Sequence, residues 1–158
     1  MKNREKIYQI TAILLLVDQF IKYLITHKMN LYDSFSVIPG FFSIFYVRNS
    51  GAAFSILEKQ SFFLIIVNIV VIVLIDRFLR KEKNLNKTYI IPIGMILGGI
   101  FGNLLDRIIH HEVIDYLSFY LKKYSFPVFN FADMMITIGI VYLIIVMLKE
   151  DRQKKVKK

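Results

Sequence analysis

The stretch YIIPIGMILGGIFGNLLDRII, residues Tyr89–Ile109, decides the fold of this chain. It is long and apolar enough to cross a bilayer as one helix, since a span needs about 20 mostly apolar residues. Within it, Gly94, Gly98 and Gly102 recur every four residues. Small residues at this spacing let helix backbones approach each other closely in a membrane. We therefore expect a transmembrane helix that packs tightly against its neighbours.

Three further apolar runs occur in the chain, in which 56% of the 158 residues are hydrophobic. The one that follows Ser61 is the weakest, because Asp76 and Arg77 interrupt its end, although an arginine there can reach the headgroups. We expect an α-helical integral membrane protein with a single membrane-embedded domain over residues 1–158. Its four transmembrane helices are predicted at about 7–25, 61–79, 89–109 and 131–148.

The net charge of +9 is concentrated in three clusters of lysine and arginine. They lie before the first predicted helix, between the second and third, and after the fourth. If the spans alternate in direction, all three clusters reach the same side, and the positive-inside rule places that side, with both termini, in the cytoplasm. This placement argues against a nucleic-acid-binding protein and favours contact with anionic membrane phospholipid.

The N-terminus resembles a secretory signal peptide, with a basic start and an apolar stretch. Asp18 and Lys22 interrupt it where a cleavage site would lie, and no A-x-A pattern follows. We therefore expect this segment to remain as a helix. The chain has no cysteine, which excludes a thiol nucleophile, thiolate metal sites and disulfides.

Two links face outward in this topology. The first, Leu31–Leu57, is rich in aromatic and β-branched residues, with Pro39-Gly40 and Ser50-Gly51 as turn signals. These features predict a small extracytoplasmic β-sheet between the first and second helices, a cradle at the headgroup level. In the second link we expect a short interfacial helix at Leu117–Tyr124, between the third and fourth helices.

Polar groups converge on this outer face, although they are far apart in sequence. Ionisable groups close to hydrocarbon are costly and suggest function. Since the helices alternate in direction, the same depth is reached by Asp18, Lys22, Asn103, Asp106, Arg107, Asp115 and Asp133.

Spacing allows a structural explanation for some of these groups. Asp18 and Lys22 are four residues apart and could form an ion pair that fixes the first helix. Asn103, Asp106 and Arg107 are spaced so that they share one helical face. Asp106 either orients Arg107 or a nearby loop, or it takes a direct part in the chemistry.

Asp115 and Asp133 are the two acids for which a chemical role is favoured. Asp133 lies at a helix N-terminus, where the helix dipole favours its charged form, so it could be a simple cap. Asp115 has no comparable structural role that would explain its presence. Two carboxylates brought together do not both ionise easily, and a shared proton supports acid–base peptide hydrolysis.

Other chemistries fit the sequence less well. His110-His111-Glu112 does not present its side chains in one direction on a helix, and H-E-x-x-H is absent, so we expect no metal. A small proton-coupled membrane transporter is the alternative function, but carriers place their acids near the midplane and within repeated halves. A scaffold that binds lipid is a third hypothesis.

Five segments together resemble the bacterial lipoprotein signal peptidase (signal peptidase II) family. They occur in the order of the family across most of the chain, and they are Asp18-Gln19-x-x-Lys22, Asn49-x-Gly51-Ala52-Ala53-Phe54, Gly98-Gly99-x-x-Gly102-Asn103-x-x-Asp106-Arg107, Val113-x-Asp115-Tyr116 and Phe129-Asn130-x-Ala132-Asp133. The family more often has Phe at the position of Tyr116, and we expect little consequence because the aromatic ring is kept.

The resemblance implies a membrane aspartic endopeptidase of the bacterial plasma membrane. Such an enzyme removes the signal peptide from diacylglyceryl-modified prolipoproteins by cleaving before the lipidated cysteine. The resemblance implies that Asp115 and Asp133 are the catalytic pair, with an active site at the outer face. The other implied roles are substrate binding or site shaping by Asn49, Asn103, Arg107 and Asn130, and structural support by Asp18, Lys22 and Asp106. We expect a monomer without a cofactor.

Overall fold

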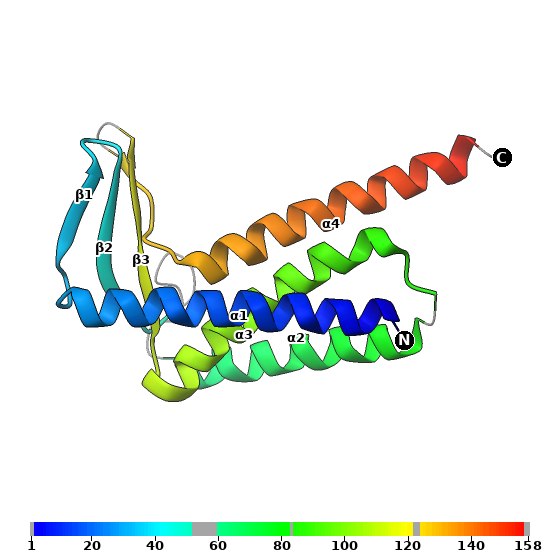
Figure 1. Ribbon diagram of the computed structural model, residues 1–158, viewed down its shortest axis with the longest axis horizontal. Coiled ribbons are helices and arrows are strands. Elements are labelled where there is room, and N and C mark those ends of the chain that lie inside the picture. The colour runs from blue at the N-terminus through cyan, green and yellow to red at the C-terminus, as the bar shows by residue number, and fades with distance from the viewer. Residues whose placement is uncertain (1, 52–59, 83, 122–123, 157–158) are drawn as a thin grey trace.

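The computed structural model describes residues 2–51, 60–82, 84–121 and 124–156. The four α-helices lie lengthwise along one side of the molecule with alternating chain direction, and the strands cross one end of this bundle (Figure 1). Along the chain the elements are α1 (Lys2–Lys28), β1 (Ser34–Ile38), β2 (Phe42–Asn49), α2 (Ser61–Lys81), the 3₁₀ helix η2 (Lys87–Tyr89), α3 (Ile90–His110), β3 (Val113–Leu121), β4 (Tyr124–Ser125) and α4 (Phe131–Val156).

All four α-helices are long and apolar enough to cross a membrane, as the sequence predicted. The mean hydropathy of the spanning segment is 1.4 for α1, 2.6 for α2, 1.7 for α3 with its 3₁₀ turn and 2.4 for α4. The helices α1 and α4 extend well beyond their apolar runs. Lysine, arginine and glutamate are good helix formers, so their charged ends continue the helix outside the hydrocarbon.

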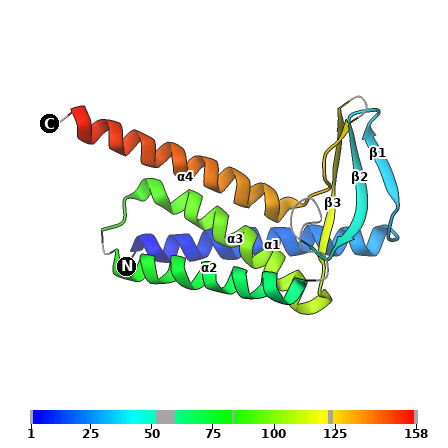
Figure 2. The ribbon, with the colours of Figure 1, turned by 180° about the vertical axis from the view of Figure 1, so that it is seen from behind.

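Helix α3 is the centre of the bundle, and Figure 2 shows it between α4 on one side and α1 and α2 on the other. In its spanning segment 67% of the residues are buried, against 17%, 6% and 17% for α1, α2 and α4. A Cβ at Gly94 would lie 2.7 Å from Cγ2 of Ile10, and one at Gly98 would lie 2.8 Å from Cβ of Leu14. The glycine spacing therefore allows the close packing that the sequence predicted, and the structure shows that the neighbour at Gly94 and Gly98 is α1.

The sheet has the strand order β1-β2-β3-β4, with antiparallel pairs throughout. The expected strands in the first outward link are confirmed as β1 and β2, while residues 52–57 of that link lie outside the described residues. The turn between the two strands contains Gly40 at a φ of 71°, a left-handed conformation that glycine adopts without a steric penalty.

The interfacial helix expected at Leu117–Tyr124 is wrong, because most of this segment belongs to strand β3. Leu117 pairs with Ile44 and Phe119 pairs with Phe42, whose ring stacks on that of Phe119 at a centroid distance of 4.6 Å. Strand β2 pairs with β1 on one edge, and the backbone N–H and C=O groups on its other edge need hydrogen-bond partners. An adjacent strand such as β3 supplies these partners, and a helix would not. The cradle thus combines the first outward link with the second.

The bundle has two chemically different ends. The start of α1, the end of α2, the start of α3 and the end of α4 all lie on the side of the molecule remote from the sheet (Figure 1). The described residues of the three basic clusters therefore share one end, and the outer polar groups share the end at which β2 and β3 cross the helices.

Candidate active site

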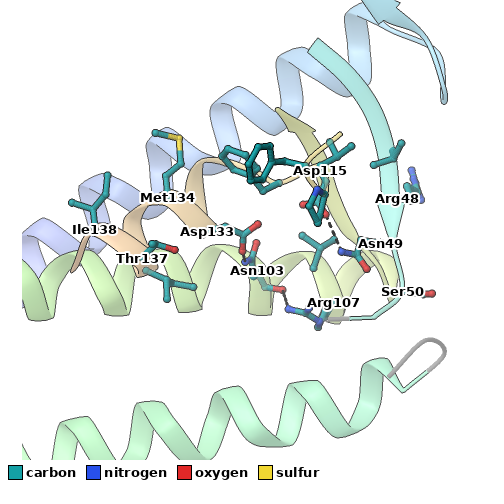
Figure 3. Close-up of a pocket in the computed structure, with 17 residues that line it drawn as sticks. Arg48, Asn49, Ser50, Asn103, Arg107, Asp115, Asp133, Met134, Thr137 and Ile138 are labelled. Carbon is teal, nitrogen blue, oxygen red and sulfur yellow. Dashed lines mark hydrogen bonds between the residues drawn. The ribbon is translucent and has the colours of Figure 1, made fainter. Parts of the chain in front are cut away.

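A pocket of about 840 Å³ opens where β2, β3, α3 and α4 meet. Asp115, the third residue of β3, and Asp133, the third residue of α4, both line it. Figure 3 shows the two carboxyl groups facing the same space from these different elements. Apolar side chains form much of the remaining wall, among them Val113, Phe129 and Ile138.

Asp115 is 2% exposed, and its carboxyl group is held by two amides. Asn49 Nδ2 donates to its Oδ2 at 3.0 Å, and Asn130 Nδ2 donates to its Oδ1 at 2.7 Å. Burial, together with the negative charge of Asp133, raises the pKa of Asp115 to about 7, although the two amide hydrogen bonds oppose the shift. A proton can therefore remain on Asp115 near neutral pH.

Asp133 lies in the first turn of α4, where the partial positive charge of the helix N-terminus favours an ionised carboxylate. Its Oδ1 accepts a hydrogen bond from Asn103 Nδ2 at 2.7 Å, and its Oδ2 accepts one from the backbone N–H of Asn130 at 3.2 Å. The Asn130 side chain in turn accepts from the backbone N–H of Asp133 at 2.9 Å. This reciprocal pair is a capping box. Asp133 therefore caps its helix and also faces the pocket.

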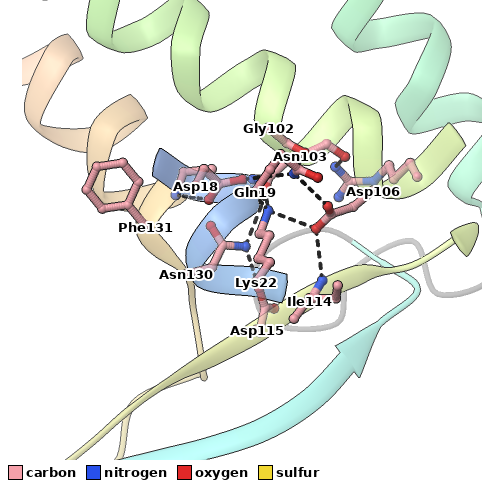
Figure 4. Close-up of polar contacts among 12 residues, drawn as sticks. Asp18, Gln19, Lys22, Gly102, Asn103, Asp106, Ile114, Asp115, Asn130 and Phe131 are labelled. Atoms are coloured by element: carbon pink, nitrogen blue, oxygen red, sulfur yellow. Dashed lines mark hydrogen bonds and ion pairs between the residues drawn. The ribbon is translucent and has the colours of Figure 1, made fainter. Parts of the chain in front are cut away.

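A buried lysine determines how Asn103 is oriented. Lys22 Nζ donates to Asn103 Oδ1 at 3.2 Å, and Asn130 Nδ2 donates to the same oxygen at 3.1 Å. Because the amide oxygen faces these donors, the amide nitrogen of Asn103 faces Asp133. Figure 4 shows Lys22 at the centre of these polar contacts.

Lys22 is 1% exposed and its charge is balanced by two carboxylates. It lies 2.8 Å from Asp18 Oδ2 and 2.8 Å from Asp106 Oδ2. The predicted pair between Asp18 and Lys22 is therefore present, but it is half of a three-residue bridge between α1 and α3. Gln19 Nε2 adds a hydrogen bond to Asp106 Oδ1 at 3.0 Å.

Asp18 and Asp106 hold neighbouring elements and do not line the pocket. Asp18 Oδ1 accepts from the backbone N–H of Ala132 at 3.1 Å, which ties α1 to the first turn of α4. Asp106 Oδ2 accepts from the backbone N–H of Ile114 at 3.1 Å, which ties α3 to β3. Of the readings open for Asp106, the one in which it holds a nearby segment matches these contacts.

Arg107 lines the pocket and is 8% exposed. Its Nη2 donates to the backbone carbonyl oxygen of Gly51 at 2.9 Å and its Nη1 to that of Asn103 at 3.4 Å. Within the described part of the chain, its Nε has no hydrogen-bond partner. The positive charge of the guanidinium lies close enough to Asp115 and Asp133 to interact with both.

The structure thus brings together the nine residues that the sequence singled out, in two groups. Five of them line the pocket, namely Asn49, Asn103, Arg107, Asp115 and Asp133. The others support this group from behind, with Asn130 in contact with both acids and Asp18, Lys22 and Asp106 forming the ion bridge.

Some contributors were not assigned a role from the sequence. Gln19 was part of a matching segment, but its contact with Asp106 depends on how α1 meets α3. The wall formed by Phe126–Phe129 was given no role, although Phe129 begins one of the matching segments. In the segment that begins at Asn49, residues 52–54 lie outside the described residues. Among the residues that the structure describes, no three or more His, Cys, Asp or Glu side chains are grouped as metal ligands would be.

Comparison with known proteins identifies the family. The sequence profile of signal peptidase (SPase) II matches residues 10–149. The lipoprotein signal peptidase of Bacillus pumilus (strain SAFR-032) is 38% identical over 148 residues, which cover 94% of this chain and 96% of that protein. The lipoprotein signal peptidase of Staphylococcus haemolyticus (strain JCSC1435) is 37% identical over 142 residues, covering 90% of each.

The fold agrees with these matches. A bacterial membrane enzyme solved by the in meso method at 2.3 Å resolution superposes with a TM-score of 0.86 at 35% identity, covering 94% of this chain and 90% of that one. A second, solved at 1.9 Å, gives a TM-score of 0.80 at 36% identity, covering 90% and 92%. Because sequence and fold agree over nearly the whole length, this chain belongs to the signal peptidase II family of aspartic peptidases.

Proposed function

We propose that this membrane enzyme removes the signal peptide from diacylglyceryl-modified prolipoproteins, and that Asp115 and Asp133 cut the peptide bond before the lipidated cysteine. The observation that carries the proposal is the pocket with two carboxyl groups from different elements, each fixed by amide donors. A water molecule between two such groups can be activated by one and aligned by the other.

Asp115 is the acid of the pair and Asp133 is the base. Asp115 retains its proton near neutral pH, because burial and its neighbour raise its pKa to about 7. Asp133 has the helix N-terminus, the Asn103 amide and a backbone N–H, all of which stabilise a negative charge. Lys22 strengthens this asymmetry, since it holds Asn103 with its amide nitrogen toward Asp133.

The protons and bonds balance in two steps. The water attacks the scissile carbonyl carbon while Asp133 takes a proton from it and Asp115 gives its proton to the carbonyl oxygen, which forms a gem-diol. The C–N bond then breaks as Asp133 returns a proton to the amine of the lipidated cysteine. One hydroxyl group of the gem-diol gives its proton to Asp115, which restores the starting protonation state.

The rest of the pocket suits an extended peptide attached to lipid. Arg107 lines the pocket, and the positive charge of its guanidinium can attract a substrate carbonyl oxygen. Asn49, Asn103 and Asn130 fix the two acids and shape the polar part of the site. The apolar wall can accept the acyl chains while the peptide bond meets water.

The orientation in the membrane follows from the charge. The basic end faces the cytoplasm by the positive-inside rule, so both termini are cytoplasmic and the pocket opens at the outer face of the plasma membrane. We propose that the chain works as a single-domain monomer in contact with membrane phospholipid, without a cofactor and without nucleic acid.

The test is the identity of the cleavage product. Purified enzyme in lipid is given a synthetic diacylated precursor and the same peptide without the diacylglyceryl group. We expect cleavage of the first alone, with a product that begins at the lipidated cysteine by mass spectrometry. Equal cleavage of both peptides, or a product that begins elsewhere, would contradict the proposed substrate class.

A further inference from the structure

The first turn of α4 carries Asp133, and its backbone donors are capped from three directions. The first N–H groups of a helix lack partners within the helix. Here the N–H of Phe131 donates to the hydroxyl oxygen of Tyr116 at 3.1 Å. The N–H groups of Ala132 and Asp133 donate to the side chains of Asp18 and Asn130. The position of this turn therefore depends on side chains from α1 and β3 as well as on its own cap.

The Tyr116 contact differs from the others because it comes from the strand that carries the other acid. Tyr116 follows Asp115 directly, and successive side chains in a strand point to opposite faces. Asp115 therefore faces the pocket, while Tyr116 belongs to a buried apolar cluster with Tyr46 and Ile114, against which Ile21 and Ile25 of α1 pack.

The ring of Tyr116 is held firmly. It is 3% exposed, and the backbone N–H of Tyr116 donates to the carbonyl oxygen of Phe129 at 3.1 Å. Burial raises the pKa of Tyr116, so its hydroxyl group stays neutral over the working pH range. A fixed ring gives a fixed acceptor for the first N–H of α4.

We propose that the hydroxyl group of Tyr116 is a positioning group for the carboxyl pair, because it ties the first turn of α4, with Asp133, to strand β3, with Asp115. This inference rests on the proposed function of the two acids. It also revises the expectation that Tyr at this position acts only as an aromatic ring, since the hydroxyl group makes a contact that Phe cannot make.

The test is Tyr116→Phe, with Tyr120→Phe as the matched control. Tyr120 lies in the same strand, and its hydroxyl oxygen accepts from Ser43 Oγ at 3.4 Å within the sheet, away from α4. Both changes remove one hydroxyl group and keep the ring. We expect Tyr116→Phe to lower kcat about three- to tenfold with KM unchanged, the effect of one lost positioning hydrogen bond. Tyr120→Phe should keep wild-type kcat.

The pH profile separates positioning from stability. Among the described residues, the charged groups around the pair are Asp18 and Lys22 from α1, Arg48 from β2, and Asp106 and Arg107 from α3. If the first turn of α4 moves away from β3, Asp133 repels the charged form of Asp115 less and Asp115 becomes less buried. Both changes lower the pKa of Asp115. The alkaline limb of the kcat profile of Tyr116→Phe should then move to lower pH by about half a unit, while that of Tyr120→Phe stays in place.

Two results would overturn the inference. One is a Tyr116→Phe variant with the kcat, pH profile and Tm of the wild type. The other is a Tyr116→Phe variant with a lower Tm but an unchanged kcat and pH profile, which would show that the Tyr116 hydroxyl group only stabilises the fold. Asp115→Asn and Asp133→Asn are measured alongside. If those variants still cleave, the proposed catalytic pair fails; if they are inactive while Tyr116→Phe matches wild type, only the role of Tyr116 fails.

Discussion

The side-chain nitrogen of Asn130 lies 2.7 Å from Oδ1 of Asp115, so the residue that caps α4 also holds the acid of strand β3. The same side chain accepts a hydrogen bond from the backbone N–H of Asp133 through its oxygen. Asn130 is 0% exposed and cannot exchange these partners for water. One amide thereby fixes both carboxyl groups relative to each other.

Asn130→Ala should lose both contacts. We expect kcat to fall about 10- to 100-fold, because the two lost hydrogen bonds together contribute about 1–3 kcal/mol to holding the two carboxyl groups in place. The lost N-cap should also lower the free energy of unfolding by about 1 kcal/mol. Enzyme assays and thermal melts on the same preparation measure the two effects.

Asn130→Asp separates the cap from the donor. Aspartate can still cap α4, so the Tm should stay near wild type, but it cannot donate to Asp115 and it adds negative charge. A nearby negative charge raises the pKa of Asp115 further, so the alkaline limb should move to higher pH while kcat falls. A wild-type kcat in this variant would show that the amide donor is unimportant.

The pH dependence of kcat/KM should be bell-shaped. Activity requires Asp115 with its proton and Asp133 without one, so activity is lost when Asp115 ionises as the pH rises. On the alkaline side, kcat/KM should therefore decrease with a midpoint at about pH 7, the raised pKa of Asp115. Rates are measured between pH 4 and 9, about the range over which the pair is expected to titrate. Melting curves at each pH show that the enzyme stays folded; a flat profile above pH 7 would contradict the assignment of the acid.

Lys22→Met should destabilise the enzyme strongly. It would leave the carboxylates of Asp18 and Asp106 buried without their cation, and breaking a buried ion pair costs about 3–5 kcal/mol. Arg80→Met is the control, since the pair of Arg80 with Asp76 is exposed at the other end of the bundle and should change the Tm little. Thermal melts in the same detergent compare the variants, and equal Tm values would show that the ion bridge is not structural.

Chelation should leave the activity intact. The two carboxyl groups and one water supply both the acid and the base, so the proposed reaction has no step that needs a metal. Cleavage is measured after dialysis against EDTA, with a magnesium-dependent enzyme as a positive control for chelation. Loss of activity that zinc restores would point to a metallopeptidase.

The sequence predicted the membrane bundle because spanning helices are set by local properties. The apolar length of Tyr89–Ile109 and the positions of the basic clusters do not depend on distant contacts. The pairing of Asp18 with Lys22 was likewise visible, since it follows from a four-residue helical spacing.

Features that depend on distant partners were not predicted. The segment Leu117–Tyr124 has residues suited to either a helix or a strand, and the edge of β2 decides between them. Asp18 and Asp106 could not be separated from the pocket acids by depth alone. Their backbone partners, Ala132 and Ile114, become neighbours only when α1, α3, α4 and β3 are packed together.

Cleavage by isosteric variants of the two acids tests the central claim most directly. Asp115→Asn, Asp133→Asn and the control Asp76→Asn, a half-buried acid at the opposite end of the bundle, are purified in lipid and given the diacylated precursor. We predict that each of the first two lowers kcat at least about 10³-fold while its Tm shows that it is folded, and that Asp76→Asn cleaves like wild type. Near-wild-type cleavage by a folded Asp115→Asn or Asp133→Asn variant would contradict the account.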